Sequence, residues 1–153
     1  MRATRAFALS LLVVATAACG SDSNRLYGSA SEVYDLSFDT VEVSKVSTFL
    51  VIEYLKGTAK VMKCTVDLAG LTVTPGQPID LLALSAGIPR GTLQRIVQST
   101  IDIPIQSGTL TLDSVPTGGA ELTGRFRTTL PSATGGAAGR TLNGDFDEVV
   151  VQK

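Results

Sequence analysis

The feature that most constrains this chain is the alternation of apolar and polar residues along short segments separated by turn residues. In one such segment, Met62, Cys64 and Val66 alternate with Lys63 and Thr65. Successive side chains of a β-strand point to opposite faces, so residues at alternate positions share one face. The segment is therefore predicted to be a strand that is half-buried in a sheet. About eight segments of this kind, with turn signals roughly every 8 to 12 residues, predict an all-β fold. The architecture expected is an antiparallel β-sandwich or a closed β-barrel with at most one short helix.

One expected strand contains a proline. Ile101, Ile103 and Ile105 lie at alternate positions, and Pro104 stands between the last two. Because proline has no N–H to donate to a ladder, this segment is expected at a sheet edge, with residues 109–115 as its neighbour. Further strands are predicted at residues 32–43, 47–56, 61–68 and 71–74.

Residues 78–98 fit two interpretations. Their leucines and isoleucines suit helical spacing about as well as extended spacing. One interpretation is a short helix over residues 80–86 that ends at Gly87, since glycine readily adopts the left-handed conformation that terminates helices. The other is a loop that covers the sheet.

The last third of the chain contains an internal repeat. Residues 122–126 (LTGRF) and 142–146 (LNGDF) share the form L-x-G-x-F. A glycine between large apolar neighbours commonly lets a facing group approach closely. The small residues at 131–140 predict the loop of a long hairpin. Together with the preceding G-x-L-x-L segment, this pattern resembles the C-terminal half of uncharacterised all-β bacterial lipoproteins, a resemblance that implies a fold and no particular activity.

The N-terminus has the order of an export signal. Arg2 and Arg5 precede an apolar run at residues 6–14, and small residues follow the run. This run is shorter than the roughly 20 apolar residues that a membrane-spanning helix needs. The tetrapeptide Thr16-Ala17-Ala18-Cys19 resembles the lipobox of bacterial lipoproteins. Thr16 stands where such motifs usually carry an aliphatic residue, so cleavage by the ordinary signal peptidase near Ala18 remains the alternative.

The lipobox resemblance implies that Cys19 is acylated and becomes the N-terminus of a lipoprotein. Acyl chains such as palmitate would then hold the protein on a membrane of the bacterial cell envelope. Gly20 follows Cys19 where an aspartate would resemble an inner-membrane retention signal, so the outer membrane is favoured. The expected organisation is a signal peptide at 1–18, a lipidated cysteine and tether at 19–26, and a single β domain at 27–153.

If Cys19 carries lipid, Cys64 has no cysteine partner, because the chain has only these two. No internal disulfide is therefore expected. Cys64 shares the apolar face of its predicted strand, which places its thiol in the core. An apolar setting opposes thiolate formation, so a reactive cysteine is not predicted there.

Composition excludes several classes of function. The chain has no histidine, which removes Ser-His-Asp and Cys-His catalysis together with the commonest transition-metal ligand. Its 13 basic and 14 acidic residues give a net charge of −1, and the basic residues form no run, so nucleic-acid binding is not expected. No phosphate-binding glycine motif precedes a helix, and no cofactor is predicted.

Asp145, Asp147 and Glu148 form the one acidic cluster that merits weighing. Asp145 and Asp147 share a strand face, and calcium prefers several oxygen ligands of this kind. The alternative is that Arg125 or Arg127 on the partner strand pairs with these carboxylates. We predict no metal site and no catalytic residue.

Three functions remain open. The first is a non-enzymatic, membrane-anchored lipoprotein whose domain binds a protein or surface partner. The second is a carrier of small apolar ligands with a pocket like that of lipocalin barrels. The third is a hydrolase that works through paired carboxylates, although the chain has no tryptophan and few aromatic residues to line a sugar-binding cleft. Only Cys19, as the lipid attachment site, is assigned a role, and the ligand-binding residues stay unassigned.

Overall fold

The computed structural model describes residues 23–131 and 139–153, so the predicted signal peptide and Cys19 lie outside the described residues. The described residues form twelve strands and one turn of 3-10 helix. In chain order these are β1 (Arg25–Tyr27), η1 (Ser29–Glu32), β2 (Thr40–Val46), β3 (Phe49–Lys56), β4 (Ala59–Asp67), β5 (Pro78–Asp80), β6 (Leu84–Ser85), β7 (Ile88–Pro89), β8 (Gly91–Ile96), β9 (Thr100–Ile103), β10 (Ser107–Leu112), β11 (Glu121–Thr129) and β12 (Thr141–Gln152).

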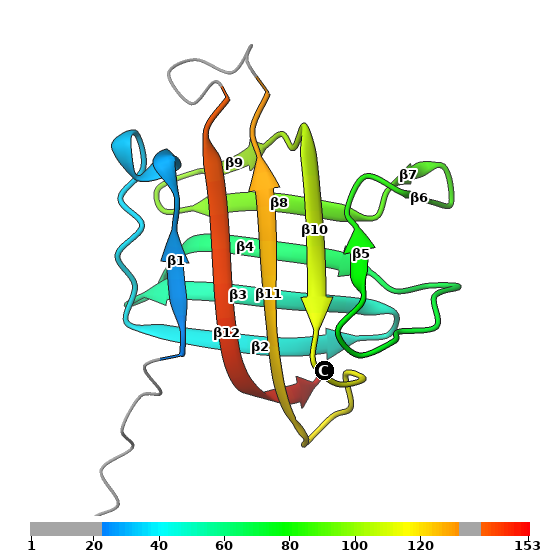
Figure 1. Ribbon diagram of the computed structural model, residues 1–153. Helices are drawn as coiled ribbons and strands as arrows, with labels where there is room; N and C mark the ends of the chain where they lie inside the picture. Colours follow the sequence, from blue (N-terminus) through cyan, green and yellow to red (C-terminus); the bar gives the residue numbers. More distant parts are fainter. Residues whose placement is uncertain (1–22, 132–138) are drawn as a thin grey trace, which may run out of the picture.

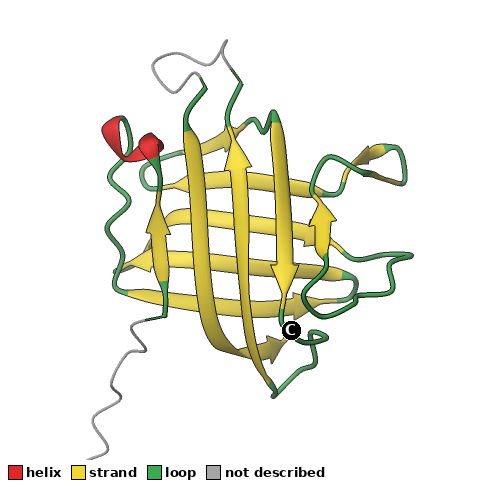
Figure 2. Ribbon diagram, viewed as in Figure 1, coloured by secondary structure: helices red, strands yellow, loops and turns green. Residues whose placement is uncertain are grey.

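Ten of the strands form one curled sheet, a half-barrel. Its order is β5-β10-β11-β12-β2-β3-β4-β8-β9, with β1 paired to β12 outside this order, while β6 and β7 form a separate hairpin. Strands β1, β12, β11, β10 and β5 run across β2, β3, β4 and β8, so the sheet folds over into two crossed layers (Figures 1 and 2). The prediction of an all-β fold with at most one short helix is confirmed.

Strand β12 joins the two layers. Its residues from Thr141 to Val149 pair antiparallel with β11, whereas Val150, Val151 and Gln152 pair in parallel with β2. A strand that bends from one layer into the other makes the corner of an orthogonal β-structure. The remaining pairings in the described sheet are antiparallel, as expected.

Aromatic side chains fill the space between the layers. Tyr54 of β3 meets the ring of Phe38 edge-on at 5.1 Å between centroids and the ring of Phe126 at 6.2 Å. Tyr54, Phe126 and Phe146 are all buried, and the Tyr54 hydroxyl donates a hydrogen bond of 2.9 Å to the carbonyl oxygen of Asp145. The interior of the half-barrel is therefore occupied by side chains at the place where a lipocalin-like barrel would hold its ligand.

The two L-x-G-x-F copies face each other in the predicted long hairpin. Gly124 lies opposite Phe146, and Phe126 lies opposite Gly144. A Cβ atom added at Gly124 would come within 2.5 Å of Cζ of Phe146, and one at Gly144 would meet the ring of Phe126 and the hydroxyl of Tyr54. Each glycine thus provides the space for the phenylalanine of the other copy.

Two predicted strand segments are not strands. Residues 33–38 pair with no strand: Val33 and Tyr34 form the turn after η1, residues 35–38 have no regular secondary structure, and β2 begins only at Thr40. The alternation still predicts which side chains face the core, because Leu36 is buried and Tyr34 and Phe38 pack against the core. Residues 71–74 lie between two turns, in which the N–H of Leu71 donates to the carbonyl of Leu68 and that of Gln77 donates to the carbonyl of Thr74. Residues 71–74 pair with no strand.

The helix considered for residues 80–86 is wrong. Residues 80–86 contain the end of β5, a turn and β6, and the whole ambiguous segment 78–98 contains β5, the β6–β7 hairpin and β8. Ala86 and Gly87 both have positive φ angles, 51° and 86°, which is the requirement of a two-residue type I′ hairpin turn. Gly87 takes the left-handed conformation that was expected of it, but in a hairpin turn and not at the end of a helix.

The edge position of residues 101–105 is confirmed, because β9 is the last strand in the sheet order. Its predicted neighbour is wrong. Strand β9 pairs with β8 through a short hairpin, whereas β10 pairs with β5 and β11. The chain leaves the ladder at Pro104, which cannot donate a hydrogen bond to it, and crosses to the other layer.

The folded part also begins earlier than Tyr27. Arg25 and Leu26, which were placed in the tether, pair with Asp145 and Gly144 as part of β1. Asn24 contributes as well, because its side-chain amide donates a 2.6 Å hydrogen bond to Glu148.

Candidate functional site

The acidic cluster is neutralised by neighbouring side chains. Asp145 accepts hydrogen bonds from Arg127 at 2.6 Å and from Arg25 at 2.8 Å, and both guanidinium groups lie over the ring of Tyr27. Arg125 is directly opposite Asp145 in the ladder, but Arg127, which is diagonal to it, makes the ion pair. Of the three carboxylates, Asp145 is thus the one that pairs with arginine.

The two other carboxylates of this cluster are bonded to uncharged side chains. Asp147 accepts a hydrogen bond of 3.0 Å from the hydroxyl of Thr123, and Glu148 accepts one from Asn24. In residues 23–131 and 139–153, no group of three or more His, Cys, Asp or Glu side chains is arranged to hold a metal ion.

The thiol of Cys64 lies in the core, as predicted, and is fully buried. Burial raises its pKa from about 9.0 to about 12, because the thiolate would lose its hydration. Cys64 therefore has the properties of an apolar core residue and not of a nucleophile.

The most apolar opening described in the structure lies where the sheet fails to close into a barrel. Leu81 bridges the two ends of the sheet there: its N–H donates to the carbonyl of Gly108 in β10 at 2.9 Å, and its carbonyl accepts from the N–H of Gly91 in β8 at 2.8 Å. A Cβ atom at Gly91 would come within 2.6 Å of Cβ of Leu81. Glycine at position 91 thus allows this contact between the two ends.

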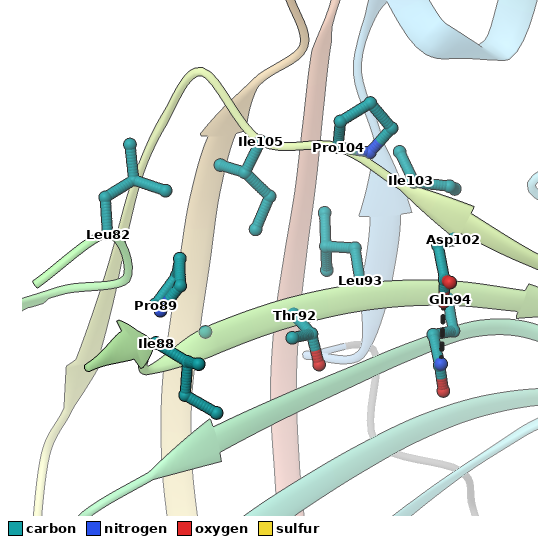
Figure 3. Close-up of a pocket in the computed structure, with 11 residues that line it drawn as sticks. Leu82, Ile88, Pro89, Thr92, Leu93, Gln94, Asp102, Ile103, Pro104 and Ile105 are labelled. Atoms are coloured by element: carbon teal, nitrogen blue, oxygen red, sulfur yellow. Dashed lines mark hydrogen bonds between the residues drawn. The ribbon is translucent and has the colours of Figure 1, made fainter. Parts of the chain in front are cut away.

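Beside Leu81 lies a groove of about 510 Å³, which we call the seam groove. Its volume falls in the range of roughly 300–1,000 Å³ that is typical of small-molecule sites. Two buried core residues, Leu93 and Ile103, contribute to its lining. The seam groove is lined by Leu82, Ile88, Pro89, Gly91, Thr92, Leu93, Gln94, Asp102, Ile103, Pro104 and Ile105 (Figure 3).

One wall of the seam groove is the β6–β7 hairpin, which is tied to the end of β4. The Ser85 hydroxyl donates a 2.6 Å hydrogen bond to the carboxylate of Asp67, and Nη1 of Arg90 donates to the Asp67 carbonyl at 2.5 Å. Hydrogen bonds from the Ser85 hydroxyl and the Ala69 N–H lower the pKa of Asp67 below its usual range. These contacts position Ile88, which is 67% exposed, at the mouth of the seam groove.

The opposite end of the seam groove is polar. Gln94 of β8 and Asp102 of β9 lie opposite each other, and the Gln94 amide nitrogen donates a 2.8 Å hydrogen bond to the Asp102 carboxylate (Figure 3). Among the described residues that line the seam groove, Asp102 is the single ionisable one. The seam groove can therefore bind a ligand through apolar contacts and one acceptor-rich end, but it lacks the paired carboxylates that glycoside hydrolysis requires.

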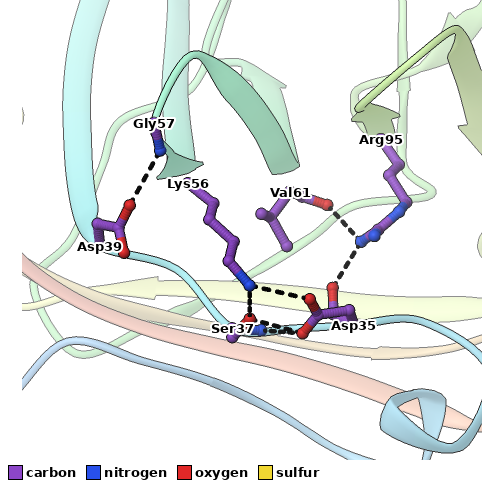
Figure 4. Close-up of polar contacts among 7 residues, drawn as sticks. All are labelled: Asp35, Ser37, Asp39, Lys56, Gly57, Val61 and Arg95. Atoms are coloured by element: carbon purple, nitrogen blue, oxygen red, sulfur yellow. Dashed lines mark hydrogen bonds and ion pairs between the residues drawn. The ribbon is translucent and has the colours of Figure 1, made fainter.

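A second polar cluster holds residues 33–39 against the sheet (Figure 4). Asp35 accepts hydrogen bonds from both the hydroxyl and the N–H of Ser37 and an ion pair from Lys56 at 3.1 Å. These contacts, led by the Ser37 hydroxyl, hold the pKa of Asp35 well below its usual range. Arg95 donates to the carbonyl oxygens of Asp35 and Val61. The charged groups of this cluster are engaged with one another and with backbone, which indicates a structural role.

The chain matches no family model, and no curated protein or solved structure is found to be similar to it. Nothing in the described part of the chain is a helix with the length and apolarity to cross a bilayer.

No sequence pattern predicted the seam groove. Its residues come from the segment of ambiguous periodicity, from β9 and from the β9–β10 connection. One signal was present: Pro89 and Pro104 both directly follow an isoleucine. Apolar residues beside prolines in strands are poorly suited to ladders, so they favour positions at an edge or opening.

Proposed function

We propose that this protein is a non-enzymatic binding domain of the bacterial envelope, anchored through a lipid on Cys19, and that it binds small apolar compounds in the seam groove. The observation that carries the proposal is an open groove of about 510 Å³ whose lining is mostly apolar and includes Ile88, which is 67% exposed. A ligand there would cover apolar surface that otherwise faces water, at roughly 25 cal/mol per Å².

The proposed ligand site is the groove at the open edge of the half-barrel and not a pocket inside a barrel. The interior is filled by Tyr54, Phe126 and Phe146, so a ligand inside the sheet would have to displace them. The seam groove needs no such displacement. Its single ionisable lining residue in the described chain, Asp102, also favours binding over acid-base chemistry, which uses a positioned acid and base together.

The lipid anchor would keep the seam groove near a membrane. Ser23, the first described residue, is four residues after Cys19 and hydrogen-bonds to Asp147 of β12. Four extended residues span at most about 14 Å. The domain would therefore stay close to the bilayer, which is a source of apolar compounds.

The test is binding of Nile red, a neutral apolar dye, followed by its fluorescence. We expect saturable binding that Ile88→Asp weakens by roughly tenfold or more, because a charge would replace an apolar contact at the mouth. Leu84→Asp is the matched control, since Leu84 is on the same hairpin and is 66% exposed against 67% for Ile88, but does not line the seam groove.

Circular dichroism and urea unfolding establish that both variants fold. Wild-type affinity in Ile88→Asp, or equal losses in the two variants, would place the dye elsewhere and refute the assignment of the seam groove. The absence of saturable binding to the wild-type protein would refute apolar-ligand binding itself.

A further inference from the structure

The polar end of the seam groove determines which apolar ligands suit it, an inference that rests on the function proposed above. We propose that the seam groove selects single-chain amphiphiles with a cationic, hydrogen-bond-donating head, such as an alkylammonium group, and rejects the corresponding carboxylates. The Asp102 carboxylate is the group that would receive the head.

The Asp102 carboxylate has acceptor capacity that remains for a ligand. Oδ1 of Asp102 accepts the hydrogen bond from Gln94, whereas Oδ2 has no hydrogen-bond partner among the described residues. An ionised carboxylate can accept several hydrogen bonds and donates none. Asp102 therefore presents acceptors, which match the N–H groups of an ammonium head.

Two cationic side chains, Lys63 and Arg95, lie on strands near Asp102. Lys63 of β4 lies opposite Gln94, so it is two strands away from Asp102, and it does not line the seam groove. Arg95 follows Gln94 in β8, but its guanidinium group donates to the carbonyl oxygens of Asp35 and Val61. Among the described residues, no ion pair joins either cation to Asp102, and Arg95 is engaged with backbone carbonyl groups.

The apolar and charged groups of the seam groove lie at opposite ends. Ile88, Pro89 and Leu82 lie at one end of the seam groove, and Asp102 lies with Gln94 at the other (Figure 3). Because successive residues of a strand face opposite sides, Asp102 and Gln94 lie on the other face of the β8–β9 ladder from the buried Leu93. An alkyl chain whose head meets Asp102 would therefore run along Thr92 and Pro89 toward Ile88. A carboxylate head in the same position would face a like charge at close range, which is unfavourable even in a partly solvated site.

The test compares decylammonium, 1-decanol and decanoate by isothermal titration calorimetry at pH 7, each below the concentration at which it forms aggregates. The three probes share one alkyl chain, so their differences report the head group. We expect decylammonium to bind at least about tenfold more tightly than decanoate, with 1-decanol between them.

Asp102→Asn tests the residue itself. We expect this variant to bring decylammonium and decanoate within about threefold of each other, because the charge is removed while the shape is kept. Asp113→Asn is the matched control: Asp113 is also exposed, does not line the seam groove, and its substitution changes the net charge by the same amount. This control should retain the full preference.

The outcomes separate this inference from the proposed function. If the three probes bind equally well, or if Asp102→Asn and Asp113→Asn change the preference alike, the selection by Asp102 is refuted while apolar binding stands. If none of the probes binds and Nile red also fails, the proposed function is refuted.

Discussion

At the scale of single residues, burial governs the chemistry of the one thiol in the described chain. Cys64 lies opposite Ile52 of β3 and Leu93 of β8, and its environment offers no group that would stabilise a thiolate. In a Cys19→Ala variant, we expect Cys64 to be unreactive toward Ellman's reagent at pH 8 in the native state. The thiol should react stoichiometrically once urea unfolds the domain. Rapid labelling of the native protein would contradict the burial of Cys64.

The same burial predicts a dependence of stability on pH. The pKa of Cys64 is about 12 in the folded state and about 9.0 ordinarily, so between these values the unfolded state binds fewer protons than the folded state. The free energy of unfolding should therefore fall as pH rises above 9, by about 1.4 kcal/mol per pH unit from this group. Urea unfolding between pH 8 and 10.5 measures the slope. Cys64→Ala should show a shallower slope, and identical slopes would contradict the prediction.

At the scale of elements, the β11–β12 hairpin depends on the space that its glycines leave. We expect Gly144→Ala to destabilise the domain by about 1–3 kcal/mol, because the new methyl group would overlap the ring of Phe126 and the hydroxyl of Tyr54. Urea unfolding at pH 7 provides the measurement. A change within about 0.5 kcal/mol of wild type would show that the ring shifts without cost.

A double-mutant cycle provides the control. Phe126→Leu removes part of the ring that Gly144 accommodates, so adding Gly144→Ala to it should cost less than in the wild-type background. Coupled contacts of this kind deviate from additivity by roughly 0.5–3 kcal/mol. Strictly additive losses would show that the two residues act independently.

At the scale of the whole molecule, the lipid anchor would decide where the domain works. We expect the protein purified from membranes of a bacterial host to have Cys19 as its N-terminus, with a mass increased by diacylglycerol and a fatty acid. Intact mass spectrometry measures this, and Cys19→Ala should abolish both the modification and the membrane association. An unmodified, soluble species cut elsewhere would contradict the anchor and would make the domain a secreted or periplasmic one.

Local patterns predicted the elements whose structure depends on neighbouring residues. Alternation identified β4, and an apolar run with β-branched residues identified β3. The turn at residues 57–58 separates the two strands, as predicted. Equal spacing in the two L-x-G-x-F copies predicted the β11–β12 hairpin, and the equal spacing also allows each glycine to face the other copy's phenylalanine. Cys64 was placed correctly in the core for the same local reason.

Long-range contacts decided the rest. The parallel pairing of Val150 with Val43 joins β12 to β2 across more than 100 residues, and no local sequence pattern predicts it. The apolar residues of segment 78–98 fit helical and extended spacing equally well. The hydrogen bonds of Leu81 to β8 and β10 show why the extended form is adopted. The seam groove lies where the two ends of the sheet, which are in contact at Leu81, diverge near Pro104. Alternation along the sequence thus determined which residues form strands and which side chains are buried, whereas the partners of those strands, and the groove between them, were decided by packing across the whole domain.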